Sequence, residues 1–233
     1  MADHGSSVLI TGGTGGLGAA VVRRFLTAGW RVVVPWVRRS EVDRLPPDDS
    51  LDLLEADLFD AGSVRDVAER ANADPGRPLR AVANLVGGFA MDGKVHETPV
   101  EEFEEQLRLN LRATYLVSQA TVPYLIEAGG GAITCVSSRA ALRPFAGAAG
   151  YITSKLAVLG LVDSLAAEYL AAGVRVNAVL PSVIDTPGNR AGQPDADHSR
   201  WVRPEQIADV LFFLSGDAAS VISGAHIPVY GRA

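Results

Sequence analysis

Cysteine is nearly absent from this sequence of 233 residues, which contains Cys135 and no other. A lone cysteine excludes a disulfide within the chain and favours a reducing, cytoplasmic location. The N-terminal residues MADHGSS lack the basic segment and the apolar core of a secretory signal peptide. Histidine is also scarce, and because its four residues are scattered and have no metal-ligand spacing, we predict no metal site.

Long apolar runs and an excess of positive charge are missing as well. The most apolar stretch, AVLGLVDSLAAEYLAA, is interrupted by Asp163 and Glu168, so no membrane-spanning helix is predicted. The 21 basic and 27 acidic residues give a net charge of −6, which repels phosphate backbones and anionic lipids. We therefore expect a soluble globular protein with neither a nucleic acid nor a membrane as its partner.

Short apolar segments alternate along the chain with longer helix-like segments. Several of the short segments carry apolar residues in succession, as strands covered on both faces do. This rhythm predicts an α/β fold, a doubly wound parallel sheet flanked by helices, in a single domain of residues 1–233. The strands are expected at residues 7–11, 31–36, 50–56, 80–86, 131–137, 173–181 and 225–230, and the helices at 16–28, 61–73, 100–128, 150–172 and 203–215. Residues 185–203 form the one long irregular stretch.

The first predicted strand leads into a glycine-rich turn, TGGTGGLG, at residues 11–18. Glycine allows positive φ and a close approach of the backbone to a ligand, and the N-terminus of the next helix offers free N–H groups to a pyrophosphate. A turn in this position predicts a dinucleotide-binding site. The spacing of Gly12, Gly16 and Gly18 is T-G-x-x-x-G-x-G.

A tyrosine and a lysine stand four residues apart in YITSK, residues 151–155, at the predicted start of a helix. Residues at this spacing share one face of a helix. An ammonium beside a phenol favours the phenolate and lowers a pKa that is normally about 10. Tyr151 with Lys155 beside it is therefore a candidate general acid or base. The alternative is an ordinary helix start with an exposed lysine.

These motifs resemble the short-chain dehydrogenase/reductase family, and the resemblance extends over about residues 8–228. It implies a Rossmann-type fold and an NAD(P)-dependent oxidoreductase that interconverts a carbonyl and an alcohol by hydride transfer. It also implies four catalytic residues. Tyr151 is the general acid or base, Ser138 binds the reacting oxygen, Lys155 holds the nicotinamide ribose, and Asn110 bends its helix and feeds a proton relay. Ser138 precedes the tyrosine by the family's thirteen residues, and the neighbouring Ser137 is the alternative.

The resemblance implies a set of cofactor-binding residues in addition. NLVGG departs from the family's N-N-A-G at Leu85 and Val86, and Ser182 stands where glycine is common, which costs stability if the position needs positive φ. Asp57, the expected adenine contact, could instead cap a turn. The predicted residues are Gly12, Thr14, Gly16, Leu17, Gly18, Trp36, Arg38, Arg39, Asp57, Leu58, Asn84, Gly87, Tyr151, Lys155, Pro181, Ile184 and Thr186.

The end of the second strand bears on the choice of nicotinamide cofactor. Trp36 stands where NAD-preferring relatives carry an acidic residue for the ribose. Arg38 and Arg39 follow and could accept a 2′-phosphate. The segment favours NADP, and NAD stays open because arginine pairs are common on surface loops.

Residues 184–201 resemble the corresponding stretch of dihydropteridine reductase, a member of the same family. The main prediction is an enzyme for a small-molecule carbonyl or alcohol, and one alternative is a pterin reductase like that member. The presence of Ser138 argues against the pterin reductase, because that branch lacks its catalytic serine. A second alternative is a non-catalytic, dinucleotide-binding regulator. Family members also pair the helices expected at 100–128 and 150–172, which implies a homo-oligomer, either a dimer or a tetramer.

Overall fold

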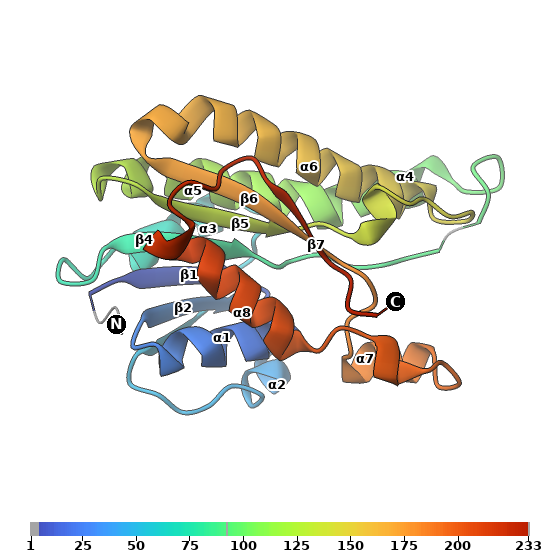
Figure 1. The fold of residues 1–233 in the computed structure, drawn as a ribbon, viewed down its shortest axis with the longest axis horizontal. Helices are drawn as coiled ribbons and strands as arrows, with labels where there is room; N and C mark the ends of the chain where they lie inside the picture. Colours follow the sequence, from blue (N-terminus) through green and yellow to red (C-terminus); the bar gives the residue numbers. More distant parts are fainter. Residues whose placement is uncertain (1–4, 92, 233) are drawn as a thin grey trace.

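A seven-stranded sheet forms the centre of the computed structural model, which describes residues 5–91 and 93–232 (Figure 1). The spatial order is β3-β2-β1-β4-β5-β6-β7, and every pair of neighbours is parallel. The predicted doubly wound parallel sheet is confirmed. Its strands are β1 (Ser7–Thr11), β2 (Arg31–Trp36), β3 (Leu51–Glu55), β4 (Leu79–Asn84), β5 (Gly131–Val136), β6 (Val174–Pro181) and β7 (His226–Val229).

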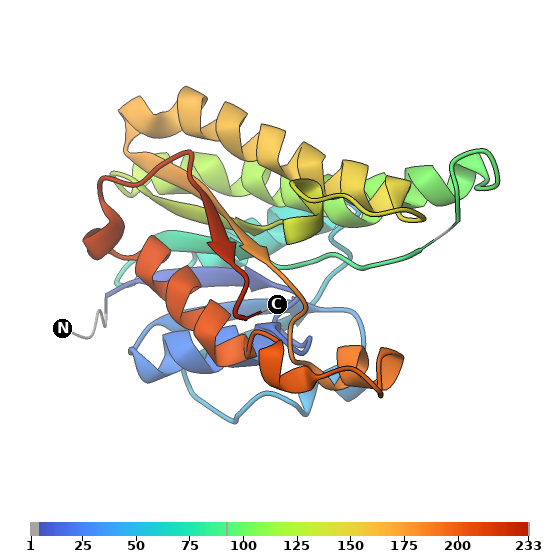
Figure 2. The same cartoon turned by 45° about the vertical axis from the view of Figure 1, so that its right-hand side comes forward.

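Helices cover both faces of the sheet, as Figures 1 and 2 show. One face carries α3 (Ala61–Ala71), α5 (Ala113–Glu127) and α6 (Ala149–Tyr169), and the other carries α1 (Gly18–Thr27) and α8 (Pro204–Ser215). Three shorter helices complete the labelled set: α2 (Arg39–Val42), α4 (Val100–Leu107) and α7 (Pro187–Gly192). Each face has its own apolar cluster, so the core consists of two layers separated by the sheet.

Strand β1 illustrates why the strands read as continuous apolar runs. Successive side chains of a strand point to opposite faces of the sheet. Leu9 lies in the layer beneath α3, α5 and α6, whereas Val8 and Ile10 lie in the layer beneath α1 and α8. Because both faces are covered, every position of β1 is buried. The strand therefore shows no alternation of apolar and polar residues.

The helical segments differ from the expectations in three places. The helix expected at 100–128 is interrupted by a π-helical turn, Arg108–Arg112, between α4 and α5. The stretch 185–203 is not wholly irregular, since it contains α7 and a 3₁₀ turn, His198–Arg200. The four-residue helix α2 was not predicted, because it is too short to show a periodic apolar pattern. Among the described residues no helix is long and apolar enough to cross a membrane.

The strand order reverses between β1 and β4, the position at which doubly wound sheets bind ligands beyond the carboxyl ends of their strands. The glycine turn follows β1 directly, and the loops after β4, β5 and β6 leave the sheet at the same edge (Figure 1). The fold therefore brings the candidate residues of the turn and of these loops to one edge of the sheet.

The packing of the glycine turn gives a stability prediction. A Cβ at Gly18 would lie 2.1 Å from the Gly12 carbonyl oxygen and 2.6 Å from the Gly13 Cα, so Gly18→Ala must displace backbone. We expect this variant to lower the free energy of unfolding by about 1–3 kcal/mol in urea denaturation.

Gly160→Ala on α6 is the matched control, because a Cβ there meets no atom within 4 Å. Alanine favours a helix interior over glycine by about 0.5–1 kcal/mol, so this control should be slightly more stable than the parent protein. Equal stability of the Gly18→Ala variant and the parent would show that the turn tolerates a side chain and would contradict the packing argument.

Candidate active site

The glycine turn packs closely on the ends of two neighbouring elements. Gly12 has φ of +66°, and a Cβ there would lie 3.2 Å from the Leu85 carbonyl carbon and the Val86 nitrogen. A Cβ at Gly16 would lie 2.9 Å from the Thr186 methyl group. The turn is therefore in contact with the end of β4 and with the loop after β6. Side chains at these positions would press on the backbone after β4 and on Thr186.

The first turn of α1 is the second part of the candidate binding site for a dinucleotide. Leu17 occupies its N-cap position and has no side-chain atom that could cap the helix. Helix N-termini without a side-chain cap leave N–H groups that suit a phosphate. The side-chain-free turn and this helix end together fit the pyrophosphate of a dinucleotide.

Tyr151 and Lys155 lie on the first two turns of α6, as the sequence predicts. Ser138, which follows β5, lies near Tyr151, and its side chain lowers the pKa of the phenol as a hydrogen-bond partner. The buried Lys155 ammonium lies 6.0 Å from the centre of the Tyr151 ring and donates a hydrogen bond of 3.1 Å to the Val136 carbonyl. The serine, the tyrosine and the lysine thus come together at the carboxyl end of β5.

The electrostatics differ from the expectation of a lowered tyrosine pKa. Burial raises the pKa of Tyr151, and the hydrogen bond with Ser138 acts in the opposite direction without overcoming it. Burial also lowers the pKa of Lys155 to about 8. The predicted lowering is therefore wrong for the chain by itself, because loss of solvent outweighs the stabilisation of a phenolate.

Asn110 occupies the middle of the π-helical turn and is buried. Its Oδ1 accepts a hydrogen bond of 3.0 Å from the Gly88 amide, and its Nδ2 donates one of 3.2 Å to the Gln106 carbonyl. A Cβ at Gly87 would lie 2.6 Å from the Asn110 Oδ1 and 2.9 Å from the Lys155 Nζ. The absence of a side chain at Gly87 is what lets the amide and the ammonium approach the same point.

The two serines after β5 have different surroundings. Ser137 donates a hydrogen bond of 2.7 Å to the backbone carbonyl of Lys155, which ties α6 to the sheet. The Ser138 oxygen accepts a hydrogen bond of 3.1 Å from the Ala140 amide and is the one linked to Tyr151. The geometry thus favours Ser138 over Ser137 as the hydroxyl that faces a reacting oxygen.

The segment after β2 contains a carboxylate that sequence reasoning missed. Glu41, on α2, accepts a hydrogen bond of 3.1 Å from the Thr14 hydroxyl and forms ion pairs with Arg38 at 3.4 Å and Arg44 at 3.9 Å. Arg39 lies over the Trp36 ring at 5.8 Å. The predicted arginines are exposed beside the glycine turn, and the charge of Arg38 is partly balanced. No sequence signal indicated Glu41, since its contact with Thr14 spans two elements.

Other predicted residues have structural partners that can be named. Asp57 is exposed and caps a turn by accepting a hydrogen bond of 2.9 Å from the Phe59 amide, and the neighbouring Leu58 is buried in the core. The Nδ2 of Asn84 donates to the Ser118 hydroxyl at 3.3 Å and lies 3.9 Å from the Cys135 sulfur. Burial raises the pKa of that cysteine to about 12.

The loop after β6 holds the remaining predicted residues. Pro181 ends the strand and is buried, Ile184 forms an isolated bridge with Val202, and Thr186 caps α7. The concern about Ser182 does not materialise, because among residues 5–91 and 93–232 positive φ occurs at glycine alone. Its hydroxyl instead donates a hydrogen bond of 2.7 Å to the Tyr230 carbonyl.

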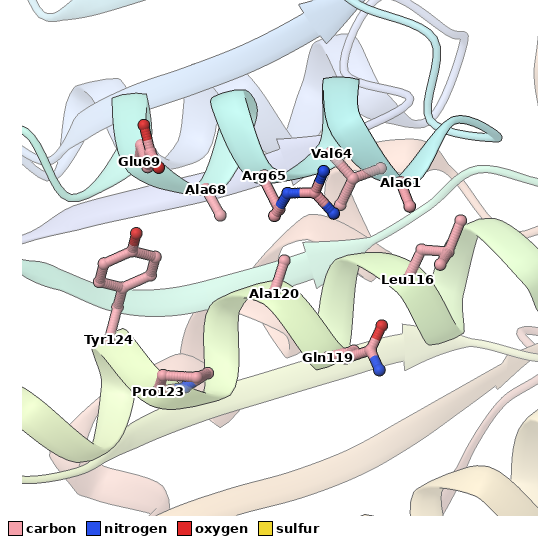
Figure 3. A pocket seen from close by; sticks show the side chains of 10 residues that line it. All are labelled: Ala61, Val64, Arg65, Ala68, Glu69, Leu116, Gln119, Ala120, Pro123 and Tyr124. Carbon is pink, nitrogen blue, oxygen red and sulfur yellow. The ribbon is translucent and has the colours of Figure 1, made fainter.

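Two hollows on the surface lie away from these residues. One, of about 420 Å³, separates α3 from α5, and Figure 3 shows Arg65 and Ala68 of α3 facing Ala120 and Tyr124 of α5 across it. The other, of about 610 Å³, lies beside the π-helical turn and α6. Neither hollow is lined by a predicted site residue. In the part of the chain that the structure describes, no group of three histidine, cysteine or acidic residues could hold a metal ion.

Comparisons with known proteins identify the family and the fold. The family described as short chain dehydrogenase matches residues 6–197. The 2-(R)-hydroxypropyl-CoM dehydrogenase of Xanthobacter autotrophicus is 32% identical, over 96% of this chain and 96% of its own length. The cyclic-di-GMP-binding biofilm dispersal mediator protein of Escherichia coli is 31% identical, over 95% of this chain and 94% of its own.

A solved short-chain type dehydrogenase/reductase from Mycobacterium ulcerans superposes with a TM-score of 0.90 at 25% identity. The superposition covers 97% of this chain and 89% of that one. This chain therefore belongs to the short-chain dehydrogenase/reductase family of NAD(P)-dependent oxidoreductases.

Proposed function

We propose that this oxidoreductase interconverts a carbonyl and an alcohol on a small molecule, with Tyr151 as the group that gives or takes the proton. One observation carries the proposal: the Ser138 side chain is near enough to Tyr151 to lower the pKa of the phenol as a hydrogen-bond partner, and Lys155 lies on the next turn of the same helix. Two hydroxyl groups this near to each other can bind one substrate oxygen between them.

The chain's own residues account for the proton and for the developing charge. In reduction, Tyr151 donates its phenolic proton to the carbonyl oxygen, and Ser138 donates a hydrogen bond that stabilises negative charge on that oxygen. In oxidation, the same tyrosine accepts the alcohol proton. Burial keeps the pKa of Tyr151 high, so the phenol is protonated at pH 7, which is the form that reduction requires.

The cofactor site is assigned to the predicted set. The glycine turn and the first turn of α1 would hold the pyrophosphate, and Lys155 the nicotinamide ribose. A nicotinamide dinucleotide bound there supplies or accepts the hydride. Lys155 has a pKa of about 8 and is mainly protonated at pH 7, so it presents a cation to the site. Asn110, fixed by the Gly88 amide, is proposed to pass protons toward Lys155.

Tyr151→Phe tests the proton transfer. Removing the hydroxyl should lower kcat for a carbonyl substrate by about 10²–10⁴-fold, since a positioned general acid contributes that much. The rate of cofactor oxidation in the presence of 2,3-butanedione and a broader carbonyl panel measures the effect. Tyr169→Phe, the same change at the end of the same helix, is the control and should leave kcat unchanged. Activity near the parent level in the Tyr151→Phe variant would eliminate Tyr151 as the acid.

We propose NADP as the preferred cofactor, on the strength of the exposed Arg38 and Arg39 beside the glycine turn and the absence of an acidic residue at Trp36. Glu41 opposes this preference, because its negative charge pairs with Arg38 and would repel a 2′-phosphate nearby. The attraction of Arg38 for a 2′-phosphate is therefore weakened by Glu41, and a substitution of Glu41 tests by how much.

Glu41→Gln removes the charge and keeps an oxygen for the Thr14 hydroxyl. The ratio of kcat/KM for NADPH over NADH should rise by about two- to fivefold, the order of an exposed charge pair. Glu127→Gln, at the end of α5, is the control and should leave the ratio unchanged. A ratio that falls in the Glu41→Gln variant would mean that this carboxylate helps to bind the phosphate-bearing cofactor, and our assignment would be wrong.

We further propose a homo-oligomer in which copies meet over the hollow beside α6. Leu107, Leu111, Tyr115, Ala157 and Leu161 line this hollow, and Tyr115 is half exposed. The alternation of apolar residues with Arg108 and Arg112 suits an interface with an apolar centre and a charged rim.

Leu161→Glu would place a charge inside that interface. Light scattering should then record a fall in mass from a dimer or tetramer to a smaller species, whereas Val95→Glu, in an exposed loop, should leave the mass unchanged. A parent protein that is monomeric at working concentration would rule out the assembly.

A non-catalytic regulator is the second candidate function, since one relative bears a name that describes cyclic-di-GMP binding and biofilm dispersal. Cofactor binding by calorimetry without turnover of any carbonyl or alcohol would favour it. The single-domain boundaries of 1–233, the cytoplasmic location and the pterin reductase alternative stay predictions. Turnover of a quinonoid dihydropterin tests the last of these.

A further inference from the structure

Three large apolar side chains beside Tyr151 are exposed, and the reaction described above does not use them. Phe89 is 59% exposed, Met91 61% and Phe145 46%. We refer to these residues as the apolar rim. Single exposed apolar residues are ordinary on a protein surface, but a group of them next to a proposed reacting hydroxyl calls for an explanation.

One residue of the apolar rim, Phe89, is in direct contact with the proposed proton donor. The Phe89 and Tyr151 ring centres are 5.0 Å apart and the ring planes are nearly perpendicular, at 87°. Phe89 lies 6.4 Å from the Phe145 ring, at 49°. The contact of Phe89 with Tyr151 is the edge-to-face arrangement that aromatic rings favour, and the contact with Phe145 is tilted. Phe89 therefore lies between the Tyr151 and Phe145 rings and is in contact with both.

Two loops supply the apolar rim, and backbone contacts hold them side by side. Phe89 and Met91 belong to the loop after β4, and Phe145 belongs to the loop between Ser138 and α6. Gly93 forms an isolated parallel bridge with Ala148 and donates a hydrogen bond of 3.3 Å to the Gly147 carbonyl. A Cβ at Gly147 would lie 3.3 Å from the Met91 methyl carbon, so the methionine lies against the second loop.

We propose that the apolar rim binds an aromatic group of the substrate, attached next to the carbonyl or alcohol carbon that reacts at Tyr151. This inference rests on the proposed function, because it takes the Tyr151 hydroxyl as the point that fixes the reacting oxygen. A flat aromatic group would cover the exposed faces of Phe89 and Phe145 while its carbonyl reaches Ser138 and Tyr151. Covering these rings removes apolar surface from water, which favours such a substrate over a small polar one.

A matched pair of diketones tests the proposal. 1-Phenyl-1,2-propanedione and 2,3-butanedione carry the same reacting group and differ by a phenyl in place of a methyl. We expect kcat/KM to be at least about tenfold higher for the phenyl compound, the change that one well-packed aromatic contact produces. Phe145→Ala should reduce this advantage by about tenfold and leave kcat/KM for 2,3-butanedione within about twofold of the parent. Phe89→Leu, which keeps an apolar side chain against Tyr151, should also reduce the advantage of the phenyl compound.

Phe213→Ala is the control, because Phe213 has a similar exposure of 43% but lies on α8, on the other face of the sheet. This control should leave kcat/KM unchanged for both diketones. Equal use of the two diketones by the parent, or a stronger preference for pyruvate, would overturn the aromatic site while leaving the proposed reaction intact.

A binding measurement separates the two proposals when turnover fails. In saturation-transfer NMR with the Tyr151→Phe variant and NADP⁺, the phenyl protons of 1-phenyl-1,2-propanedione should receive saturation. That signal should disappear in the double variant that carries both Tyr151→Phe and Phe145→Ala. Loss of turnover with both diketones but a Phe145-dependent phenyl signal would contradict the reaction and support the site. A phenyl signal that is absent at the start, or that survives Phe145→Ala, would overturn the site whatever the activity.

Discussion

The position of helix α6 against the end of β5 is the constraint on which the candidate site depends. Two hydrogen bonds set it: the Ser137 hydroxyl binds the Lys155 carbonyl at 2.7 Å, and the Lys155 ammonium binds the Val136 carbonyl at 3.1 Å. The first bond is buried and the second partly buried, and a buried polar group without a partner is costly. They fix the position of α6 along β5, and this position brings Tyr151 close to Ser138.

The same constraint explains why several small features occur together. With Lys155 fixed, Asn110 can reach the same point only if its helix bulges, and the π-helical turn supplies that bulge. Gly87 must then have no side chain, since a Cβ would be 2.6 Å from the amide oxygen of Asn110. A helix irregularity, a glycine and a buried lysine, distant in the sequence, are parts of one packing arrangement.

Much of this could be predicted from the sequence, because it depends on local pattern. The seven strands are found within one or two residues of their expected bounds, since buried parallel strands read as continuous apolar runs. Helix α6 begins where YITSK predicts it. The resemblance implies a bend at Asn110, and the structure has a π-helical turn there. The form of the bend was not predicted, because a single asparagine changes the apolar period too little to show it.

Features that arise only from the tertiary fold could not be predicted. The contact of Glu41 with Thr14 joins residues that are 27 positions apart, and the aromatic contact of Phe89 with Tyr151 joins two loops. The direction of the Tyr151 pKa was wrong for the same reason. The spacing of a lysine from a tyrosine says that they share a helix face, but the degree of burial, which dominates here, is decided by everything packed around them.

The buried cysteine has a practical consequence for spectroscopy. Cys135 is enclosed in β5, and with a pKa of about 12 its sulfur is almost entirely in the unreactive thiol form at neutral pH. Maleimide dyes and spin labels should therefore ignore it. A cysteine introduced in the loop after β4 would then be the sole point of attachment, so a single probe can be placed there without a cysteine-free background.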